Sequence, residues 1–139
     1  MKSISKGIIA AALILSLTLP VTAKDLSKTT AATTDAAQIT ESRIVDNLLV
    51  GIKSENTGLK LSALFQMGNY DTEKSVIELM RILKDDPKDE ARITAALSLY
   101  KLGDARGIYA VKRAAKFDES QRVRKMCENF YRQYVTAKL

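Results

Sequence analysis

The chain contains no histidine and only one cysteine among its 139 residues. Without histidine it lacks the ligand that most zinc sites use and the base of the usual serine and cysteine triads. It also has neither a Gly-x-Gly-x-x-Gly motif nor a P-loop, the common nucleotide-binding signatures. We therefore predict a non-enzymatic protein with no catalytic residue, no metal and no cofactor.

The one cysteine, Cys127, excludes an intrachain disulfide. When the chain is shifted by 32 residues, Cys127 aligns with Ala63 and Ala95, a column of small residues. This position favours a buried, inert thiol. The alternative is an exposed thiol that joins two copies of the chain.

An acidic cluster, made by Asp85, Asp86, Asp89 and Glu90, is the best metal candidate in the sequence. Its spacing does not match a twelve-residue calcium loop, and no glycine stands where such a loop must turn. We expect these carboxylates to complement the dipole at the start of a helix instead.

The N-terminal segment has the features of a secretory signal peptide. Lys2 and Lys6 precede an apolar run over residues 8–19, and Pro20 and small residues follow up to Ala23. The run is too short to span a bilayer, which takes about 20 residues. We predict a signal peptide over residues 1–23 and an exported protein, periplasmic or secreted; retention of the segment as an anchor stays open.

The rest of the chain divides into a linker and a helical domain. Residues 24–40 are rich in threonine and alanine and poor in large apolar side chains, which predicts a flexible linker. From Thr40 onward, apolar residues recur at intervals of three and four, as in amphipathic helices, and no stretch alternates as a strand does. We expect a domain over residues 41–136 with six helices in three hairpins, at about residues 43–70, 71–102 and 103–135.

A 32-residue period relates the three hairpins. One column holds Lys60, Arg92 and Arg124; further columns hold Met67, Leu99 and Tyr131, then Val76 and Ile108, then Leu79 and Val111. A period of this length is typical of solenoids, in which each helical hairpin buries its apolar face against the next.

The segments at residues 59–64, 91–96 and 123–127, each preceded by an apolar helix and a polar turn, resemble the HEAT-repeat family, including its bacterial lyase-like members. The resemblance covers about residues 43–135. It implies an all-α fold, a right-handed α-α superhelix of about three helical hairpins, and a role as an armadillo-like scaffold for protein partners. A lyase-like or nucleic-acid-binding HEAT protein is the remote alternative.

The family typically carries a ladder of aspartate–arginine pairs along the stack. The resemblance implies such pairs between Asp86 and Arg92 and between Asp118 and Arg124. Ser54 and Lys60 hold these positions in the first repeat, so its rung is expected to be weak or missing. The bulky aromatic residues of the last helix are expected to cap the stack.

In this family the second helices of the hairpins line the concave side. We expect their outward residues to form an apolar stripe with polar flanks that binds a peptide or helix from a partner. The candidate partner-binding residues are Phe65, Gln66, Leu97, Lys101, Met126 and Phe130. Burial of these side chains between repeats, or simple scatter, is the alternative.

The positive charge is concentrated near the C-terminus, since residues 43–100 carry a net charge of −1 and residues 101–139 a net charge of +6. A basic end attracts anionic surfaces, and an anionic envelope surface is therefore the second candidate partner. Nucleic acid is disfavoured because aromatic residues do not interleave with the charges. The candidate residues are Lys112, Arg113, Lys116, Arg122, Lys125 and Arg132. A simply solvated end is the alternative.

Overall fold

A computed structural model describes residues 23–138, which form six helices and, within this range, no strand. The helices are α1 (Ala23–Ile52), α2 (Thr57–Met67), α3 (Glu73–Asp85), α4 (Asp89–Leu102), α5 (Ala105–Phe117) and α6 (Gln121–Ala137). The predicted signal peptide lies outside the described residues apart from Ala23. No helix in the described range is both long and apolar enough to cross a membrane.

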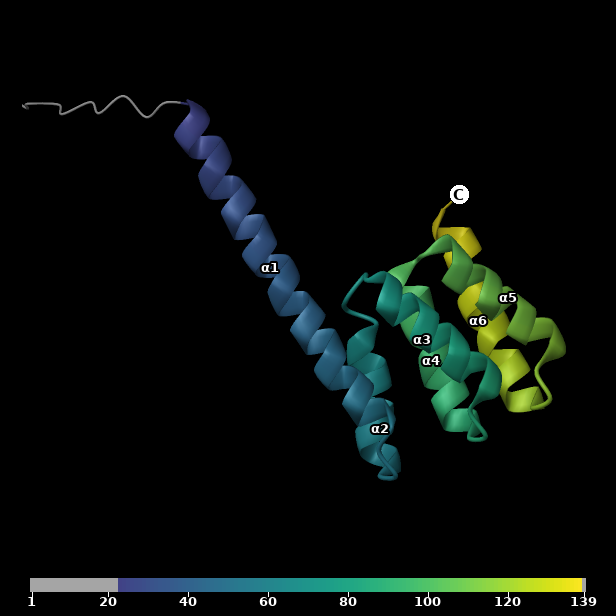
Figure 1. Cartoon of the computed structure of the whole chain (residues 1–139). Helices are drawn as coiled ribbons and strands as arrows, with labels where there is room; N and C mark the ends of the chain where they lie inside the picture. Colours follow the sequence, from purple (N-terminus) through teal and green to yellow (C-terminus); the bar gives the residue numbers. More distant parts are fainter. Residues whose placement is uncertain (1–22, 139) are drawn as a thin grey trace, which may run out of the picture.

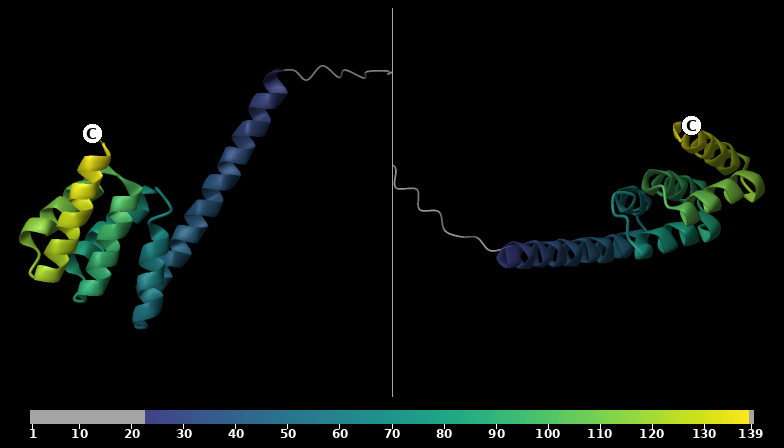
Figure 2. Two further views of the ribbon diagram at one scale, coloured as in Figure 1. Left: turned by 180° about the vertical axis from the view of Figure 1, so that it is seen from behind. Right: turned by 90° about the horizontal axis from the view of Figure 1, so that it is seen from above.

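The six helices stack as three consecutive hairpins in two layers (Figures 1 and 2). Within the hairpins, α1 packs on α2, α3 on α4 and α5 on α6. Between hairpins, α4 packs against both α2 and α6, while α3 packs against α5. We call α1, α3 and α5 the outer layer and α2, α4 and α6 the inner layer. The prediction of an all-α solenoid of three helical hairpins is confirmed.

The first helix corrects the predicted linker. Residues 24–40, expected to be irregular, continue α1 as regular helix and extend beyond the other helices (Figure 1). No proline or glycine occurs between Val21 and Val50 to stop a helix. Once the packed turns around Val45 and Ile52 have nucleated the helix, each further residue that is fixed adds one hydrogen bond, whereas nucleation fixes several residues for the first bond.

The small-residue column of the repeat lies in the hydrophobic core. Ala63, Ala95 and Cys127 are each at most 3% exposed. The inner helices approach each other closely at Gly68, where a Cβ atom would lie 2.9 Å from the Cα of Ser98. The Ser98 hydroxyl donates a hydrogen bond of 2.8 Å to the Leu64 carbonyl, so this junction of α2 and α4 is both tight and satisfied.

The end of the inner layer differs from its middle. Ala96 is fully buried in α4, whereas Glu128, its counterpart 32 residues later, is exposed on α6. Phe130 packs back against the preceding repeat, with its ring centroid 5.9 Å from that of Tyr100. A polar outer side on the last helix is what a terminal repeat needs to remain in solution.

The boundary between α4 and α5 has well-defined capping interactions at Gly103 and Asp104. Gly103 adopts the left-handed conformation after α4, with φ of 69°. The Asp104 side chain then accepts hydrogen bonds from the backbone N–H groups of Arg106 and Gly107 at the start of α5. The hydrogen bonds and the charge of Arg106 hold the pKa of Asp104 below its ordinary value.

Candidate functional site

The ion-pair ladder runs between repeats rather than within them. Lys60 Nζ lies 3.0 Å from an Asp86 carboxylate oxygen, and Arg92 Nη2 lies 3.1 Å from Asp118 Oδ1. Each cation thus reaches an aspartate 26 residues ahead. The rung from Lys60, expected to be weak or missing, is present.

The predicted pairing of Asp86 with Arg92 and of Asp118 with Arg124 is corrected. Arg92 Nη1 donates to the backbone carbonyl of Asp86 at 2.8 Å, and Arg124 Nη1 donates to that of Asp118 at 2.6 Å. Both aspartate side chains point elsewhere, because they accept from backbone N–H groups two residues ahead, those of Lys88 and Ser120. The free carboxylate oxygen of Asp86 and the carboxylate of Asp118 then face the preceding inner helix, which carries the cation.

Arg92 is the centre of this network and is only 3% exposed. Besides Asp118, its guanidinium contacts Asp89 Oδ1 at 2.9 Å and Glu119 Oε1 at 3.4 Å. Asp89 is held in turn by a hydrogen bond from the Ser120 hydroxyl. Arg92 Nε is buried without a hydrogen-bond partner. This network around Arg92 therefore links the start of α4 to the start of α6. Removing Arg92 would leave the carboxylates around it without their cation.

Arg124 holds the same position in the last repeat but has no carboxylate to meet. None of the ion pairs found within residues 23–138 includes it; besides the Asp118 carbonyl, it reaches that of Glu119 at 3.0 Å. Within the described residues, the ladder therefore consists of two ion pairs, Lys60–Asp86 and Arg92–Asp118. Arg124 is a half-buried cation whose guanidinium donates to backbone carbonyl groups.

On the inner layer, four residues from α2 and α4 form what we call the Phe65 cluster: Phe65, Gln66, Asn69 and Lys101. The Lys101 ammonium lies 4.2 Å from the centroid of the Phe65 ring and donates to Asn69 Oδ1 at 2.8 Å. Asn69 donates in turn to Gln66 Oε1 at 2.9 Å. Phe65 remains 43% exposed.

The remaining candidate partner-binding residues do not extend this cluster into a stripe. Leu97 and Met126 are half-buried and pack against the core. Phe130 is only 8% exposed. Burial between repeats, the alternative interpretation, therefore applies to these three positions. Phe65 is the apolar candidate that stays accessible, beside exposed Gln66 and Lys101.

One of the six candidate cations for an anionic surface, Arg122, takes part in an ion pair within the described residues. Arg122 pairs with Glu90 at 2.7 Å, Arg132 donates to Asn129 at 3.0 Å, and Lys112 lies 5.3 Å from the centroid of the Tyr131 ring. The other three take part in none of the ion pairs within the described range: Arg113, Lys116 and Lys125. Five of the six predicted cations therefore have no carboxylate partner within the described range, and their use in binding an anionic surface stays a prediction.

Sequence reasoning missed two aromatic residues on α5. Tyr109 is 68% exposed and Phe117 is 76% exposed. The sequence pattern could have revealed them. The buried stripe of α5 consists of Ile108 and Val111, with Ala114 and Ala115 partly buried beside them, and both aromatic residues lie outside this stripe. Large aromatic side chains that lie together outside the core are candidates for contact with other molecules.

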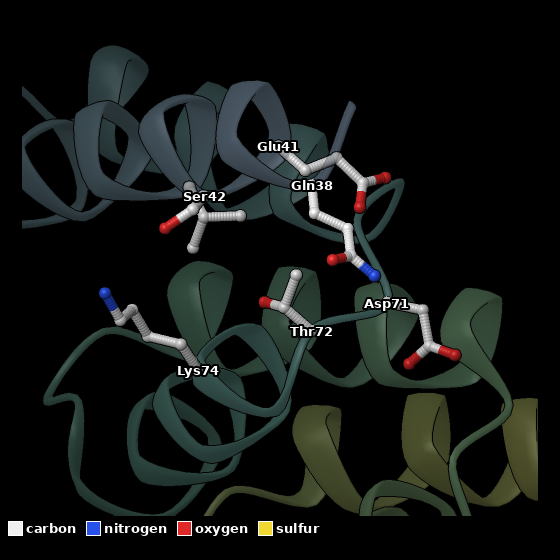
Figure 3. A pocket seen from close by; sticks show the side chains of 7 residues that line it. Gln38, Glu41, Ser42, Asp71, Thr72 and Lys74 are labelled. Carbon is white, nitrogen blue, oxygen red and sulfur yellow. The ribbon is translucent and has the colours of Figure 1, made fainter. Parts of the chain in front are cut away.

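A polar notch of about 300 Å³ lies between α1 and the start of α3 (Figure 3). Gln38, Glu41 and Ser42 line it from α1. Across from them, Thr72 caps α3 by accepting from the Ser75 N–H at 3.1 Å, and Lys74 pairs with Asp46 at 2.7 Å. No group of three histidine, cysteine or acidic residues within residues 23–138 is arranged to hold a metal ion.

These features define a repeat protein built from stacked helical hairpins. A family model described as HEAT repeats matches residues 45–129, more than half of the chain, and the protein belongs to this family. HEAT repeats generally mediate protein–protein interactions and are typically non-enzymatic. Comparisons with curated proteins and with solved structures find no match.

Proposed function

We propose that this protein is an exported, non-enzymatic module that binds a protein or peptide partner through the inner layer of its helices. The observation that supports the proposal is the Phe65 cluster. Phe65 lies on the inner layer of helices and is 43% exposed, so its ring is open to a partner. Aromatic side chains of this kind supply much of the binding energy at protein interfaces.

The polar members of the cluster give it specificity as well as area. Lys101 holds its ammonium over the ring and shares a hydrogen bond with Asn69, so these groups are already positioned in the free protein. A partner that carries an apolar side chain beside a carbonyl or carboxylate group complements such a surface. Preorganised groups lose less entropy on binding than mobile ones.

Export rests on the N-terminal segment of the sequence, with its two lysines, apolar run and small residues before Lys24. A partner of an exported protein is itself a component of the envelope or the medium. The proposal therefore concerns binding outside the cytosol.

Capture from an envelope extract tests both parts of the proposal, with Phe65→Glu and Ile77→Glu as matched variants. Ile77 is 54% exposed on outer helix α3, so both variants place one carboxylate at a partly exposed apolar site. We expect wild type and Ile77→Glu to capture the same envelope protein and Phe65→Glu to lose at least nine-tenths of it. Leu97 is left unchanged, because it packs against the core and a charge there would destabilise the fold.

Circular dichroism on the same samples shows whether each variant keeps its helices. If folded Phe65→Glu captured the partner as well as wild type does, inner-layer binding would be rejected. If a parallel cytosolic extract yielded a partner that depends on Phe65 and the envelope extract yielded none, the exported role would be contradicted.

A further inference from the structure

The outer layer contains a second surface, which we call the α3–α5 slot. It has a volume of about 330 Å³ and lies between two helices that pack side by side. Its apolar lining comes from Met80 and Leu83 on α3 and from Ala110 and Ala114 on α5. Because the alanine side chains project little from α5, the slot is recessed between the two helices.

The two exposed aromatic residues of α5 line the same slot. Tyr109 and Phe117 are 68% and 76% exposed, and the core is complete without them. They are eight residues apart, which corresponds to about 12 Å along a helix. This spacing matches two apolar side chains seven or eight residues apart in a helical partner, or three to four residues apart in an extended one.

The charge around the slot is positive. α5 carries four cationic residues and no acidic one. Arg113 lines the slot and takes part in no ion pair within the described residues. Lys84, on the α3 side, has only a 3.8 Å contact with exposed Asp85. The one acidic residue of the lining, Asp118, is already bound by Arg92.

We propose that the α3–α5 slot binds a short acidic segment of a partner protein. Apolar side chains of the segment rest on Met80 and Ala110 between the two aromatics, and its carboxylates face Lys84 and Arg113. A recessed slot with an apolar floor fits side chains, whereas a bilayer surface is flat and cannot enter it. The site lies on the outer layer, so it is independent of the Phe65 cluster.

The absence of tryptophan from the chain allows a direct test. Phe117→Trp places a single indole at the rim of the slot, and its emission reports what covers it. The probe is a synthetic twelve-residue extended peptide with two leucines four residues apart and glutamates elsewhere. We expect a saturable blue shift with this peptide and at least tenfold weaker binding when glutamine replaces every glutamate.

Variants of Phe117→Trp show where the peptide binds. Arg113→Glu should weaken binding at least tenfold, while Arg113→Gln should have a smaller effect and Phe65→Ala none. Arg113 is exposed, so these changes leave the fold intact, as thermal unfolding monitored by circular dichroism will show. The proposal fails if the glutamate peptide produces no shift, or if the glutamine peptide binds equally well. It also fails if only phosphatidylglycerol vesicles produce the shift, because the surface would then bind membrane.

Discussion

Replacing Arg92 with alanine should lower the free energy of unfolding by about 3–5 kcal/mol, the usual cost of removing one partner of a buried ion pair. Arg92 is 3% exposed, and its guanidinium lies within 3.1 Å of the carboxylates of both Asp89 and Asp118. Without it, Asp118 would remain buried with an uncompensated negative charge. Urea unfolding followed by circular dichroism measures the loss.

Arg124→Ala provides the matched control, because the same residue type occupies the same position one repeat later. Arg124 is half-buried and donates only to backbone carbonyl groups, so its removal should cost about 1 kcal/mol, the typical net value of such hydrogen bonds. Equal losses for the two variants would show that the buried carboxylate of Asp118 does not determine the contribution of Arg92.

The thiol of Cys127 should react with Ellman's reagent about a thousandfold more slowly in the native protein than in the urea-unfolded protein at pH 8. Burial raises the pKa of the thiol from an ordinary value near 9.0 to about 12, and the charge of Asp118 raises it further while that of Arg92 opposes the shift. Three pKa units correspond to about a thousandfold smaller thiolate fraction. Fast labelling, or a disulfide-linked dimer, would contradict the buried position of the side chain.

The same pKa shift has a defined effect on stability. Because the folded-state pKa lies above the unfolded one, the contribution is fully present below about pH 9 and is lost as the pH rises towards 12. Cys127→Ala should therefore show a flatter decline in unfolding free energy over this range than wild type.

Much of the fold could be predicted because the sequence repeats. Columns such as Ala63, Ala95 and Cys127 show the burial pattern directly, since a solenoid places equivalent residues in equivalent surroundings. The residue types at one turn also suit their conformations, with Gly103 left-handed before the Asp104 cap. The repeat columns are periodic and the turn residues act locally, so both can be identified from the sequence.

Contacts between neighbouring repeats were harder to predict. The chain places Asp86 six residues from Arg92, yet its carboxylate pairs with Lys60 because the backbone of the turn directs it towards the preceding helix. The length of α1 was missed for a related reason. A polar composition suggested an irregular linker, but the absence of glycine and proline let the packed turns extend the helix.

The candidate binding surface was predicted in part. Phe65 and Lys101 do meet on the inner layer, since the 32-residue period places them on neighbouring helices. Phe130 and Leu97 are withdrawn into the stack because the repeats pack closely enough to cover them. How tightly the repeats pack depends on contacts such as that of Gly68 with Ser98, which no pattern of hydrophobicity displays.

A double-mutant cycle between Arg92 and Asp118, set beside one between Arg124 and Asp118, tests the stacking of repeats most directly. We expect a coupling free energy of about 1–3 kcal/mol for Arg92 with Asp118, as is usual for residues in one buried network. For Arg124, which meets only the backbone of Asp118, the coupling should stay below about 0.5 kcal/mol, the level of independent sites. Coupling confined to Arg124 would place the ion pair within one repeat and contradict the stacked arrangement.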